Sequence, residues 1–394
     1  MTYSLKKEMF KILLFPLELI QVLPLLFLSF ISRFIKKRFD IGMGPDPLLN
    51  SVYHKKSLEY VGYKVQTFCY KPYFITNKFD IIFSSEGIFS RILITLTRWP
   101  FVYCIFTHKV FFIYFNGGPL YPFSLYLWKL EPLFLNIAGI KTVVLPYGGD
   151  VQDLTKTPNY LFRNAIINDY PSQKYHRKKI LQKVDLWSLR ANHVIAGCDW
   201  IEHLYHWDTL MVSHFAIIAH DLTPSSKLKN TGEMLILHAP NHRTIKGSEY
   251  IEIAVKNLQH QGLNIKLKII EGVSNAELIN EMIEADLIVD QLIGGWYAMF
   301  AIEAMSLAKP VVCYLRDDFL NFYKTVGVLG KNDCPIINAN PNNIEHVLKN
   351  LYHNRKILEE SSSKGPVFVK NYHSIEIIGE KFKSILLSLN IQPN

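Results

Sequence analysis

Residues 286–315, DLIVDQLIGGWYAMFAIEAMSLAKPVVCYL, limit most strongly what this chain can fold into. The run predicts an apolar strand, a Gly294–Gly295 turn, a helix that carries Glu303, and a second apolar strand. This order places the turn and the helix N-terminus at the carboxyl end of a parallel sheet, where open α/β sheets bind ligands. Free N–H groups and the helix dipole favour a phosphate there. Glu303, about two turns into the helix, would then reach a sugar or ribose hydroxyl, unless it is an ordinary surface residue.

The rest of the chain alternates strands and helices in the same way, which is typical of parallel sheets. Strands are expected at 63–70, 80–83, 109–115, 142–146, 193–196, 234–238 and 266–270, and helices at 49–61, 86–98, 123–138, 248–261, 275–284, 341–353 and 374–388. The predicted fold class is α/β, with two Rossmann-like, doubly wound domains facing a cleft. The domains are expected at 39–215 and 233–370, joined by a linker at 216–232 and followed by a C-terminal helix at 371–394. Residues 151–182 are polar and are predicted to be a mobile surface insertion.

Length and composition fit this architecture. A chain of 394 residues can form two domains that each bury a core, and 49% apolar with 20% charged residues excludes a disordered chain. The five cysteines form no CxxC pair, which argues against a zinc site or a disulfide framework and suits a reducing compartment. The net charge of +9 has no nucleic-acid-binding motif beside it, so we expect no nucleic-acid partner.

The first 38 residues carry much of the positive charge. Residues 12–35 are mostly apolar, and as a helix they would reach about 36 Å, enough to cross a bilayer. Pro16, Glu18, Gln21 and Pro24 interrupt the run, and no A-x-A cleavage site follows it. We expect this segment to associate with the anionic cytoplasmic face of the cell membrane; an uncleaved span or a buried core helix are the alternatives. The flanking cations are Lys6, Lys7 and Lys11 before the run and Arg33, Lys36, Lys37 and Arg38 after it.

Two runs in the second half resemble a known family. E-A-M-S-L-A-K-P-V-V, starting at Glu303, resembles the E-A-M-A-x-G-x-P-V-V end of the donor site in retaining glycosyltransferases of the GT-B fold. In H-A-P-N-H-R-T-I-K-G (238–247), Lys246-Gly247 resembles the Lys-Gly that binds the donor phosphates. The resemblance therefore implies ribose binding by Glu303 and phosphate binding by Lys246. It places the family's arginine at Asn241, so that Arg243 is either a displaced phosphate ligand or a solvated loop charge.

The family's Glu-x7-Glu motif is incomplete in this chain. Glu303 is its second member, but the first position holds Gly295, which has no carboxylate. Contacts to the donor sugar would then fall to the N–H groups of 295–298, or to Asp290 and Gln291. Beside these lie Trp296 and Tyr297, which would line the sugar pocket or pack in the core. Glu271-Gly272-Val273 occupies the place where the family binds the donor's base.

The facing domain supplies candidates for the acceptor side. Tyr147-Gly148-Gly149-Asp150 resembles the family's H-G-x-D loop, with tyrosine in place of histidine. Asp150 would orient an acceptor hydroxyl or cap the following helix. Asn116-Gly117-Gly118 and the turn Gly42-Met43-Gly44-Pro45 are further turns expected at the cleft. Asp150 and Glu303 are thus the candidate catalytic residues.

The resemblance implies a retaining glycosyltransferase. It would move a sugar from a nucleotide diphosphate sugar to a glycan or lipid-linked acceptor in surface polysaccharide assembly. The chain has no D-x-D motif in a metal-site context, so we expect a metal-independent enzyme with no cofactor besides its donor. A sugar-nucleotide 2-epimerase of the same fold and a non-catalytic, nucleotide-binding membrane scaffold remain the alternatives.

Overall fold

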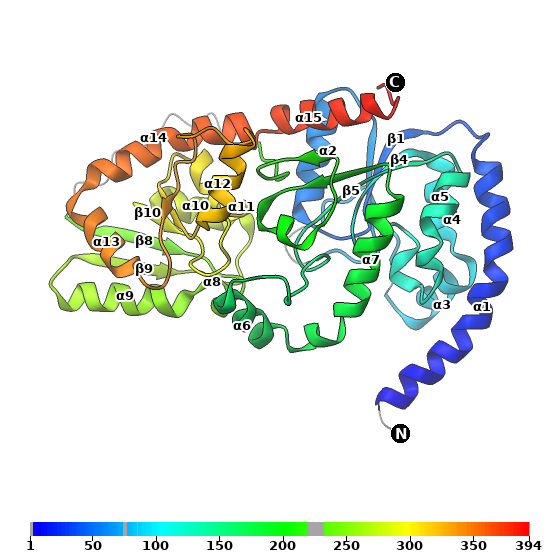
Figure 1. Ribbon diagram of the computed structural model, residues 1–394, viewed down its shortest axis with the longest axis horizontal. Coiled ribbons are helices and arrows are strands. Elements are labelled where there is room, and N and C mark those ends of the chain that lie inside the picture. The colour runs from blue at the N-terminus through cyan, green and yellow to red at the C-terminus, as the bar shows by residue number, and fades with distance from the viewer. Residues whose placement is uncertain (1–2, 74–76, 85, 219–231, 394) are drawn as a thin grey trace.

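Two parallel β-sheets form the centres of two α/β domains that lie side by side (Figure 1). The computed structural model describes residues 3–73, 77–84, 86–218 and 232–393, with side chains from residue 14 onward. The first domain lies on the right in Figure 1 and the second on the left. The predicted fold class is confirmed. Most of the predicted linker, residues 219–231, lies outside the described residues.

The first domain contains a seven-stranded sheet with the order β3-β2-β1-β4-β5-β6-β7. All its strand pairs are parallel. The chain moves from β1 outward to β3 and then returns to β4 on the other side of β1, so the topological switch point lies between β1 and β4. Its strands are β1 (Phe39–Met43), β2 (Val65–Cys69), β3 (Ile81–Ile82), β4 (His108–Tyr114), β5 (Lys141–Leu145), β6 (His193–Ala196) and β7 (Thr209–Leu210).

The second domain contains a five-stranded parallel sheet with the order β12-β11-β10-β8-β9. Here the switch point lies between β8 and β10. Open α/β sheets bind ligands at such points, outside the carboxyl ends of the strands. The strands are β8 (Met234–His238), β9 (Ile265–Ile269), β10 (Leu287–Val289), β11 (Val311–Cys313) and β12 (Ile337–Asn338).

Helices cover both faces of each sheet. In the first domain they are α1 (Tyr3–Ser32), α2 (Leu49–Tyr60), α3 (Ile88–Thr97), α4 (Trp99–Thr107), α5 (Glu131–Ile137), α6 (Tyr160–Asp169) and α7 (Arg177–Arg190). In the second they are α8 (Arg243–Lys246), α9 (Ser248–His260), α10 (Asn275–Glu284), α11 (Met299–Ser306), α12 (Asp317–Thr325) and α13 (Ile344–His353). Two long helices, α14 (Arg355–Tyr372) and α15 (Ile375–Ser388), end the chain.

Each sheet is buried on both faces, which explains its long apolar strands. In β4, Phe112 and its neighbours two residues away face α2 and α15, whereas Phe111 and Ile113 face α1, α4 and α5. In the second domain, Ile288 faces α10, α11 and α14, whereas Val289 faces α9 and α13. Both domains therefore have the same architecture, a parallel sheet covered by helices on both faces, as the alternating strands and helices of the sequence predict.

The C-terminal helices connect the domains. α14 packs on the second domain, and α15 returns to the first, where Phe382 joins the core beside Phe112 (Figure 1). A Cβ at position 379 would lie 2.4 Å from the Ser57 carbonyl oxygen of α2, so only glycine permits this close approach of the two helices. The helix predicted at 374–388 is confirmed, but its packing on the opposite domain is visible only in the structure.

Several element predictions are wrong. Residues 123–138 do not form one helix, because two 3₁₀ turns, Tyr121–Phe123 and Leu127–Lys129, precede α5. Pro122 and Pro132 start new turns there, since proline lacks the N–H that a continuous helix requires. Residues 151–182 are not a mobile insertion; they contain α6 and the start of α7.

Several elements escaped the sequence pattern, among them β1, α4, α7 and α14. β1 has only five residues and follows the basic run directly, although it lies next to the centre of the sheet. α7 has a polar sequence, yet it buries Ile180, Val184 and Trp187 in the core. Its few apolar residues are spaced for one helix face, which the charged residues between them obscure.

Candidate active site

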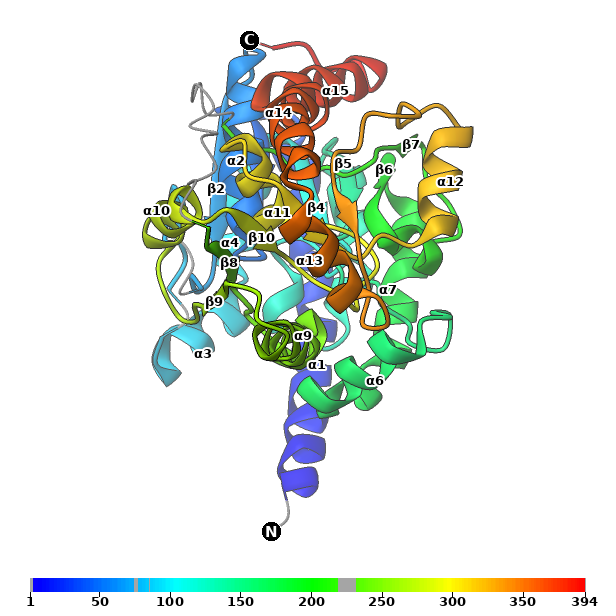
Figure 2. The same ribbon diagram turned by 90° about the vertical axis from the view of Figure 1, so that its left-hand side faces the viewer.

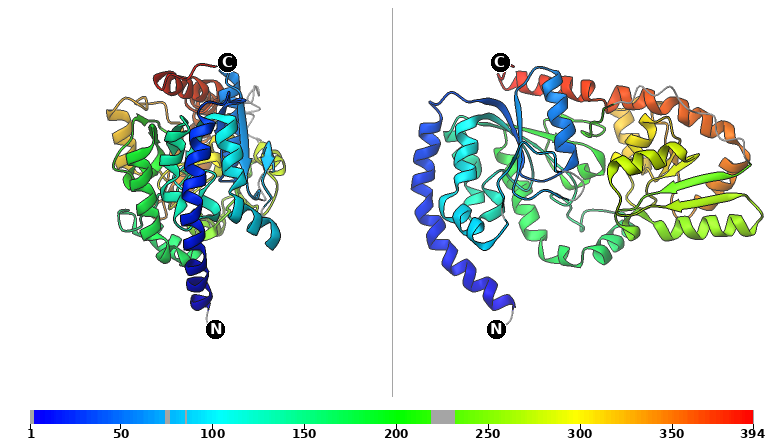
Figure 3. Two further views of the ribbon diagram at one scale, coloured as in Figure 1. Left: turned by 90° about the vertical axis from the view of Figure 1, so that its right-hand side faces the viewer. Right: turned by 180° about the vertical axis from the view of Figure 1, so that it is seen from behind.

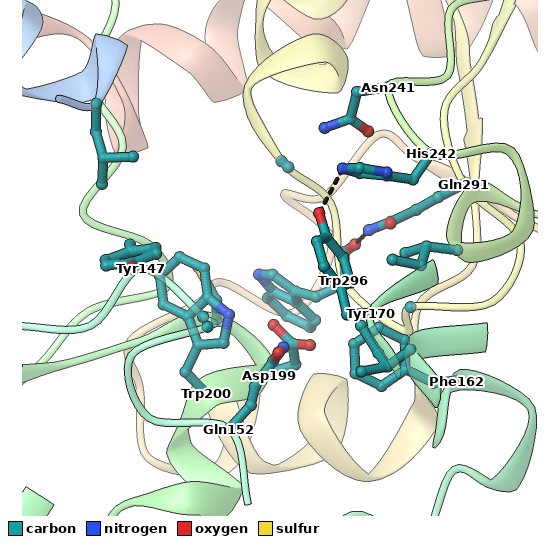
Figure 4. Close-up of a pocket in the computed structure, with 18 of the residues that line it drawn as sticks. Tyr147, Gln152, Phe162, Tyr170, Asp199, Trp200, Asn241, His242, Gln291 and Trp296 are labelled. Atoms are coloured by element: carbon teal, nitrogen blue, oxygen red, sulfur yellow. Dashed lines mark hydrogen bonds between the residues drawn. The ribbon is translucent and has the colours of Figure 1, made fainter. Parts of the chain in front are cut away.

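A cavity of about 640 Å³ lies between the domains, at the carboxyl ends of both sheets (Figure 4). The first domain lines it with the loops after β1, β5 and β6 and with α6; the second domain lines it with the loops after β8 and β10. The cavity therefore lies beside both topological switch points. Tyr170 and His242 meet across it through a hydrogen bond from one domain to the other.

The turn after β10 forms much of the second domain's wall. Gln291, Gly294, Trp296 and Tyr297 all line the cavity, as expected for a donor-side turn. The two aromatic rings stack at 5.3 Å and are each only 2% exposed, so they also anchor the turn in the core. The Gln291 amide donates to the Trp296 carbonyl and closes the turn. Trp296 and Tyr297 therefore line the cavity and pack in the core at the same time.

The glycine pair does not lie at the helix N-terminus. α11 begins at Met299, so Glu303 lies about one turn into the helix and not two. Gly295 has a φ of +93° and packs on the Arg316 side chain. The predicted direct step from glycine turn to helix is therefore wrong, because residues 296–298 form an extra segment between them.

Glu303 is a buried carboxyl with one polar partner. It is 6% exposed and accepts a hydrogen bond of 2.9 Å from the Asn275 amide. Burial raises the pKa of Glu303 to about 7, and the Asn275 hydrogen bond acts in the opposite direction. Glu303 is not among the residues that line the 640 Å³ cavity.

Lys246 and Asp290 form an ion pair at the switch point of the second sheet. The Lys246 Nζ lies 2.5 Å from Asp290 Oδ1, and the two side chains are 11% and 0% exposed. The Leu292 N–H donates to the Lys246 carbonyl, which holds α8 against the turn after β10. Gly247 ends α8 with a φ of +75°. The structure thus brings Lys246 to the start of the turn at 290–297 and gives it a carboxylate partner, but Lys246 is not among the residues that line the 640 Å³ cavity.

Arg243 and the 271–273 loop lie elsewhere. Arg243 forms ion pairs with Glu252 and Glu271 and lines a separate cavity of about 380 Å³ beside α6. Glu271, Gly272 and Val273 are exposed, and none of them lines the cavity between the domains. In this structure Arg243 is therefore paired with two carboxylates and does not line the cavity between the domains.

Asp150 braces its own loop. One carboxylate oxygen accepts the N–H groups of Tyr147 (2.9 Å) and Gly148 (3.0 Å), and the other accepts the N–H of Phe115 (3.0 Å). The side chain is 1% exposed. Burial raises the pKa of Asp150 to about 7, and these N–H groups oppose the shift. Asp150 therefore joins the ends of β4 and β5, while Gly148 and Gly149 line the cavity.

The Asn116 turn takes part in a polar network behind the cavity wall. The Asn116 amide donates to Asp46 Oδ1 (2.9 Å) and to the Tyr147 hydroxyl (2.8 Å), and it accepts from Lys183 Nζ (2.6 Å). Gly118 donates to the buried Glu131 carboxylate instead. Of the predicted turn, only Asn116 belongs to this network; Gly117 packs on Tyr121 and Glu131.

Asp46 is a cavity residue that the sequence patterns missed. Its Oδ2 is buried without a hydrogen-bond partner among the described residues, and burial raises the pKa of Asp46 to about 6. Gly44 positions it, because a Cβ there would lie 2.1 Å from the Phe68 carbonyl oxygen. Burial likewise lowers the pKa of the nearby Lys183 to about 7.

Other cavity residues were missed as well: Gln152, Tyr170, Asp199, Trp200 and His242 (Figure 4). Burial, with Glu202 nearby, raises the pKa of Asp199 to about 7. Asp46 and Asp199 follow the carboxyl ends of β1 and β6. That position was the available signal, since ligand-binding side chains gather at the carboxyl ends of parallel strands. Among the described residues, no three His, Cys, Asp or Glu side chains group as a metal site would require.

The fold is that of solved glycosyltransferases. No family model matches this sequence, and no curated protein matches it. The chain is similar to the sucrose-phosphate synthase of Thermosynechococcus elongatus (TM-score 0.55, 12% identity, covering 90% of this chain and 99% of that one). It is equally similar to Anabaena HepE, solved in complex with UDP (TM-score 0.55, 11% identity, covering 90% of this chain and 100% of that one). A third similar structure is WaaG, a glycosyltransferase involved in lipopolysaccharide biosynthesis (TM-score 0.52, 12% identity, covering 88% of this chain and 98% of that one).

These likenesses extend over both domains and define the class. The chain has the two-domain GT-B fold, with a cleft between two Rossmann-like halves. At such low identity the likeness concerns the fold alone, so the activity has to be argued from the site.

Proposed function

We propose that this protein is a glycosyltransferase that moves a sugar from a nucleotide diphosphate sugar to a glycan or lipid-linked acceptor in surface polysaccharide assembly. The observation that carries the proposal is the ion pair of Lys246 with Asp290 at the start of the turn at 290–297, because this turn and the loop that leads to Lys246 line the 640 Å³ cavity at the switch point of the second sheet, although Lys246 itself is not among its lining residues. A fixed ammonium group beside a switch point suits a diphosphate. Lys246 has three N–H donors, so it can keep Asp290 and still donate to a phosphate oxygen.

In this proposal the diphosphate leaves without a metal ion or a cofactor. Lys246 and the turn N–H groups stabilise the negative charge that develops on it. Glu303 accepts hydrogen bonds from the ribose hydroxyls. The anomeric configuration of the transferred sugar is retained. On the acceptor side, Asp46 and Asp199 replace Asp150 as the carboxylates that reach the sugar hydroxyls, because both line the cavity while both Asp150 oxygens already bind backbone N–H groups.

We also propose that the enzyme works at the anionic cytoplasmic face of the cell membrane. The segment Leu14–Ser32 of α1 is apolar enough to meet a bilayer, with a mean hydropathy of 2.1 and only 28% of it buried. The α3–α4 pair, bent by 56°, passes the same test of length and composition. A membrane location would suit a lipid-linked acceptor.

A thermal-shift panel of UDP, GDP, ADP and CMP with their sugars, run with and without EDTA, tests the donor site. We expect one nucleotide series to raise the melting temperature, because a ligand that binds only the folded state stabilises it by mass action. The rise should survive EDTA. A rise that requires a divalent metal would contradict metal independence, and no rise with any nucleotide would contradict the proposed function.

Turnover distinguishes the transferase from its alternatives. Incubation of the responding nucleotide sugar without an acceptor should leave its sugar unchanged, whereas a 2-epimerase would interconvert it. Transfer to membrane glycolipid extracts should appear only when an acceptor is supplied. Binding with neither reaction would favour the scaffold.

The titration of Glu303 predicts how nucleotide affinity depends on pH. If the ionised carboxylate accepts hydrogen bonds from the ribose hydroxyls, affinity for the responding nucleotide should rise about tenfold per pH unit below pH 7 and level off above it. Asn275→Ala removes a donor that lowers this pKa, so the midpoint should move to higher pH. Calorimetric titrations at pH 6, 7 and 8 measure both effects.

The control is Glu303→Gln, which keeps the titration of the nucleotide itself but not that of the carboxyl. Its affinity should depend on pH only as the free nucleotide does. An identical pH profile in wild type and Glu303→Gln would contradict the ribose role. Without ligand, the raised pKa of Glu303 makes the stability of the fold depend on pH in the opposite direction. The contribution of the protonated carboxyl to the free energy of unfolding is fully present below about pH 4.5 and is lost as pH rises through about 7.

A further inference from the structure

Helix α1 turns its few polar side chains toward the protein. The side chains turned inward recur every three or four residues along one face: Leu14, Glu18, Gln21, Leu25, Ser29 and Ser32. The outward face is apolar, with Leu23 75% exposed and Ile20 71% exposed. Helices on the surface of a soluble protein show the reverse arrangement, so water is not the environment that this outward face suits.

Buried polar contacts hold α1 on the domain. The Arg98 guanidinium donates to Glu18 (3.1 Å) and to Gln21 (3.0 Å), and both members of the Arg98–Glu18 ion pair are 2% exposed. The Gln21 amide donates to the carbonyl oxygens of Thr95 and Leu96 at the end of α3. α1 therefore lies along the edge of the first domain (Figure 3) and could not leave it without exposing these groups to lipid.

Helix α3 adds a second apolar surface at the same end of the molecule (Figures 1 and 3). Ile88 and Phe89, in its first turn, are 79% and 80% exposed. Trp99 follows at 39%, and Tyr126 packs edge-on against Phe15 of α1. We call the exposed apolar residues of α1 and α3 the apolar face: Phe15, Leu19, Ile20, Leu23, Phe27, Phe30, Ile88, Phe89, Ile92, Leu93 and Leu96.

The exposed charges beside α1 have one sign between residues 14 and 38, whereas Glu86, just before α3, is exposed and pairs with Lys71. Between residues 14 and 38 the only acidic residue is Glu18, which is buried against Arg98. Arg33, Lys36 and Arg38, all exposed, follow the C-terminal end of α1. Apolar side chains flanked by cations match the acyl and headgroup layers of an anionic leaflet. A soluble protein partner would need no such combination.

We propose that α1 and α3 together insert into one leaflet of an anionic membrane, with α1 lying along the surface and not crossing it. This inference builds on the membrane location proposed above and adds its geometry. The N-terminal turns of α1 project beyond the body of the protein (Figure 2). Pro16 and Pro24 lie on the exposed side of the same helix.

Co-sedimentation with vesicles tests the apolar face. The full chain should bind phosphatidylglycerol vesicles more strongly than phosphatidylcholine vesicles, and 1 M salt should weaken the difference. Leu23→Asp and Phe89→Asp should each reduce the bound fraction at least fivefold. The matched control is Leu189→Asp on α7, which changes an equally exposed leucine away from the apolar face and should leave binding unchanged.

The variants concern exposed side chains, so their melting temperatures should equal that of the wild type. Full binding by Leu23→Asp and Phe89→Asp would overturn the apolar face. A soluble homodimer that hides α1 and ignores vesicles would also overturn it. The nucleotide-induced thermal shift should survive in all variants, which separates failure of this inference from failure of the proposed donor site.

Protease protection tests the orientation. In inverted vesicles of the cell membrane, tags at the N-terminus and the C-terminus should both be digested, because α1 stays on one side. A protected N-terminal tag would mean that α1 crosses the bilayer and would overturn the inference, even if the vesicles bind the protein.

Discussion

Glu18→Ala is expected to lower the free energy of unfolding of the first domain by about 3–5 kcal/mol, the usual cost of leaving a buried charge without its partner. Arg98 would remain buried without a counter-charge. The backbone N–H groups of Leu125, Tyr126 and Leu127 would lose their acceptor as well. Denaturant unfolding in mild detergent, with wild type and variant side by side, measures the difference.

The matched control is Lys268→Ala, which breaks an ion pair with Glu281 on the surface. Its effect should stay within about 1 kcal/mol, because water already solvates both charges. Glu18→Gln, which keeps an oxygen acceptor but not the charge, should fall between the two. A loss below about 1 kcal/mol for Glu18→Ala would contradict the buried docking of α1.

Lys246→Met is expected to abolish the nucleotide-induced thermal shift and to destabilise the second domain by about 3–5 kcal/mol. The single variant cannot separate the two effects. It removes the cation of the phosphate site, and it also leaves the fully buried Asp290 without its counter-charge. The double variant Lys246→Met/Asp290→Asn separates them. Removing both charges should restore most of the stability, whereas nucleotide binding should stay absent because the phosphate still lacks its cation.

Calorimetry with UDP and denaturant unfolding are the two measurements. Nucleotide binding by the double variant at wild-type strength would show that Lys246 only supports the loop, and the donor site would have to be placed elsewhere. Arg243→Ala is the control for nearby positive charge, because Arg243 is exposed and paired with Glu252 and Glu271. It should change UDP affinity less than Lys246→Met does.

The sequence predicted the second domain better than the first. Its strands alternate regularly with amphipathic helices, and the position of Lys246 in the loop after the first strand, together with the family resemblance, placed it at the donor side. In the first domain, β1 and α7 escaped because a five-residue strand and a mostly polar helix carry little periodic signal. The local sequence pattern predicts such short or polar elements poorly, because tertiary packing determines whether they form.

The roles of individual polar residues were harder to predict than the location of the site. A glycine turn followed by Asp150 is compatible with substrate binding and with loop bracing, and only the three N–H groups around it decide between them. Asp46 and Asp199 have no motif around them. They became candidates because the folded chain leaves their carboxyls at the wall of a cavity.

The sequence by itself determined the α/β class, the division into two domains and the apolar character of α1, because these depend on hydrophobic periodicity and turn residues that act locally. Only the tertiary structure decided which way α1 faces, which carboxylates reach the cavity and that Lys246 has a partner. Those properties depend on residues far apart in the chain, such as Glu18 with Arg98 and Lys246 with Asp290, whose proximity no local pattern records.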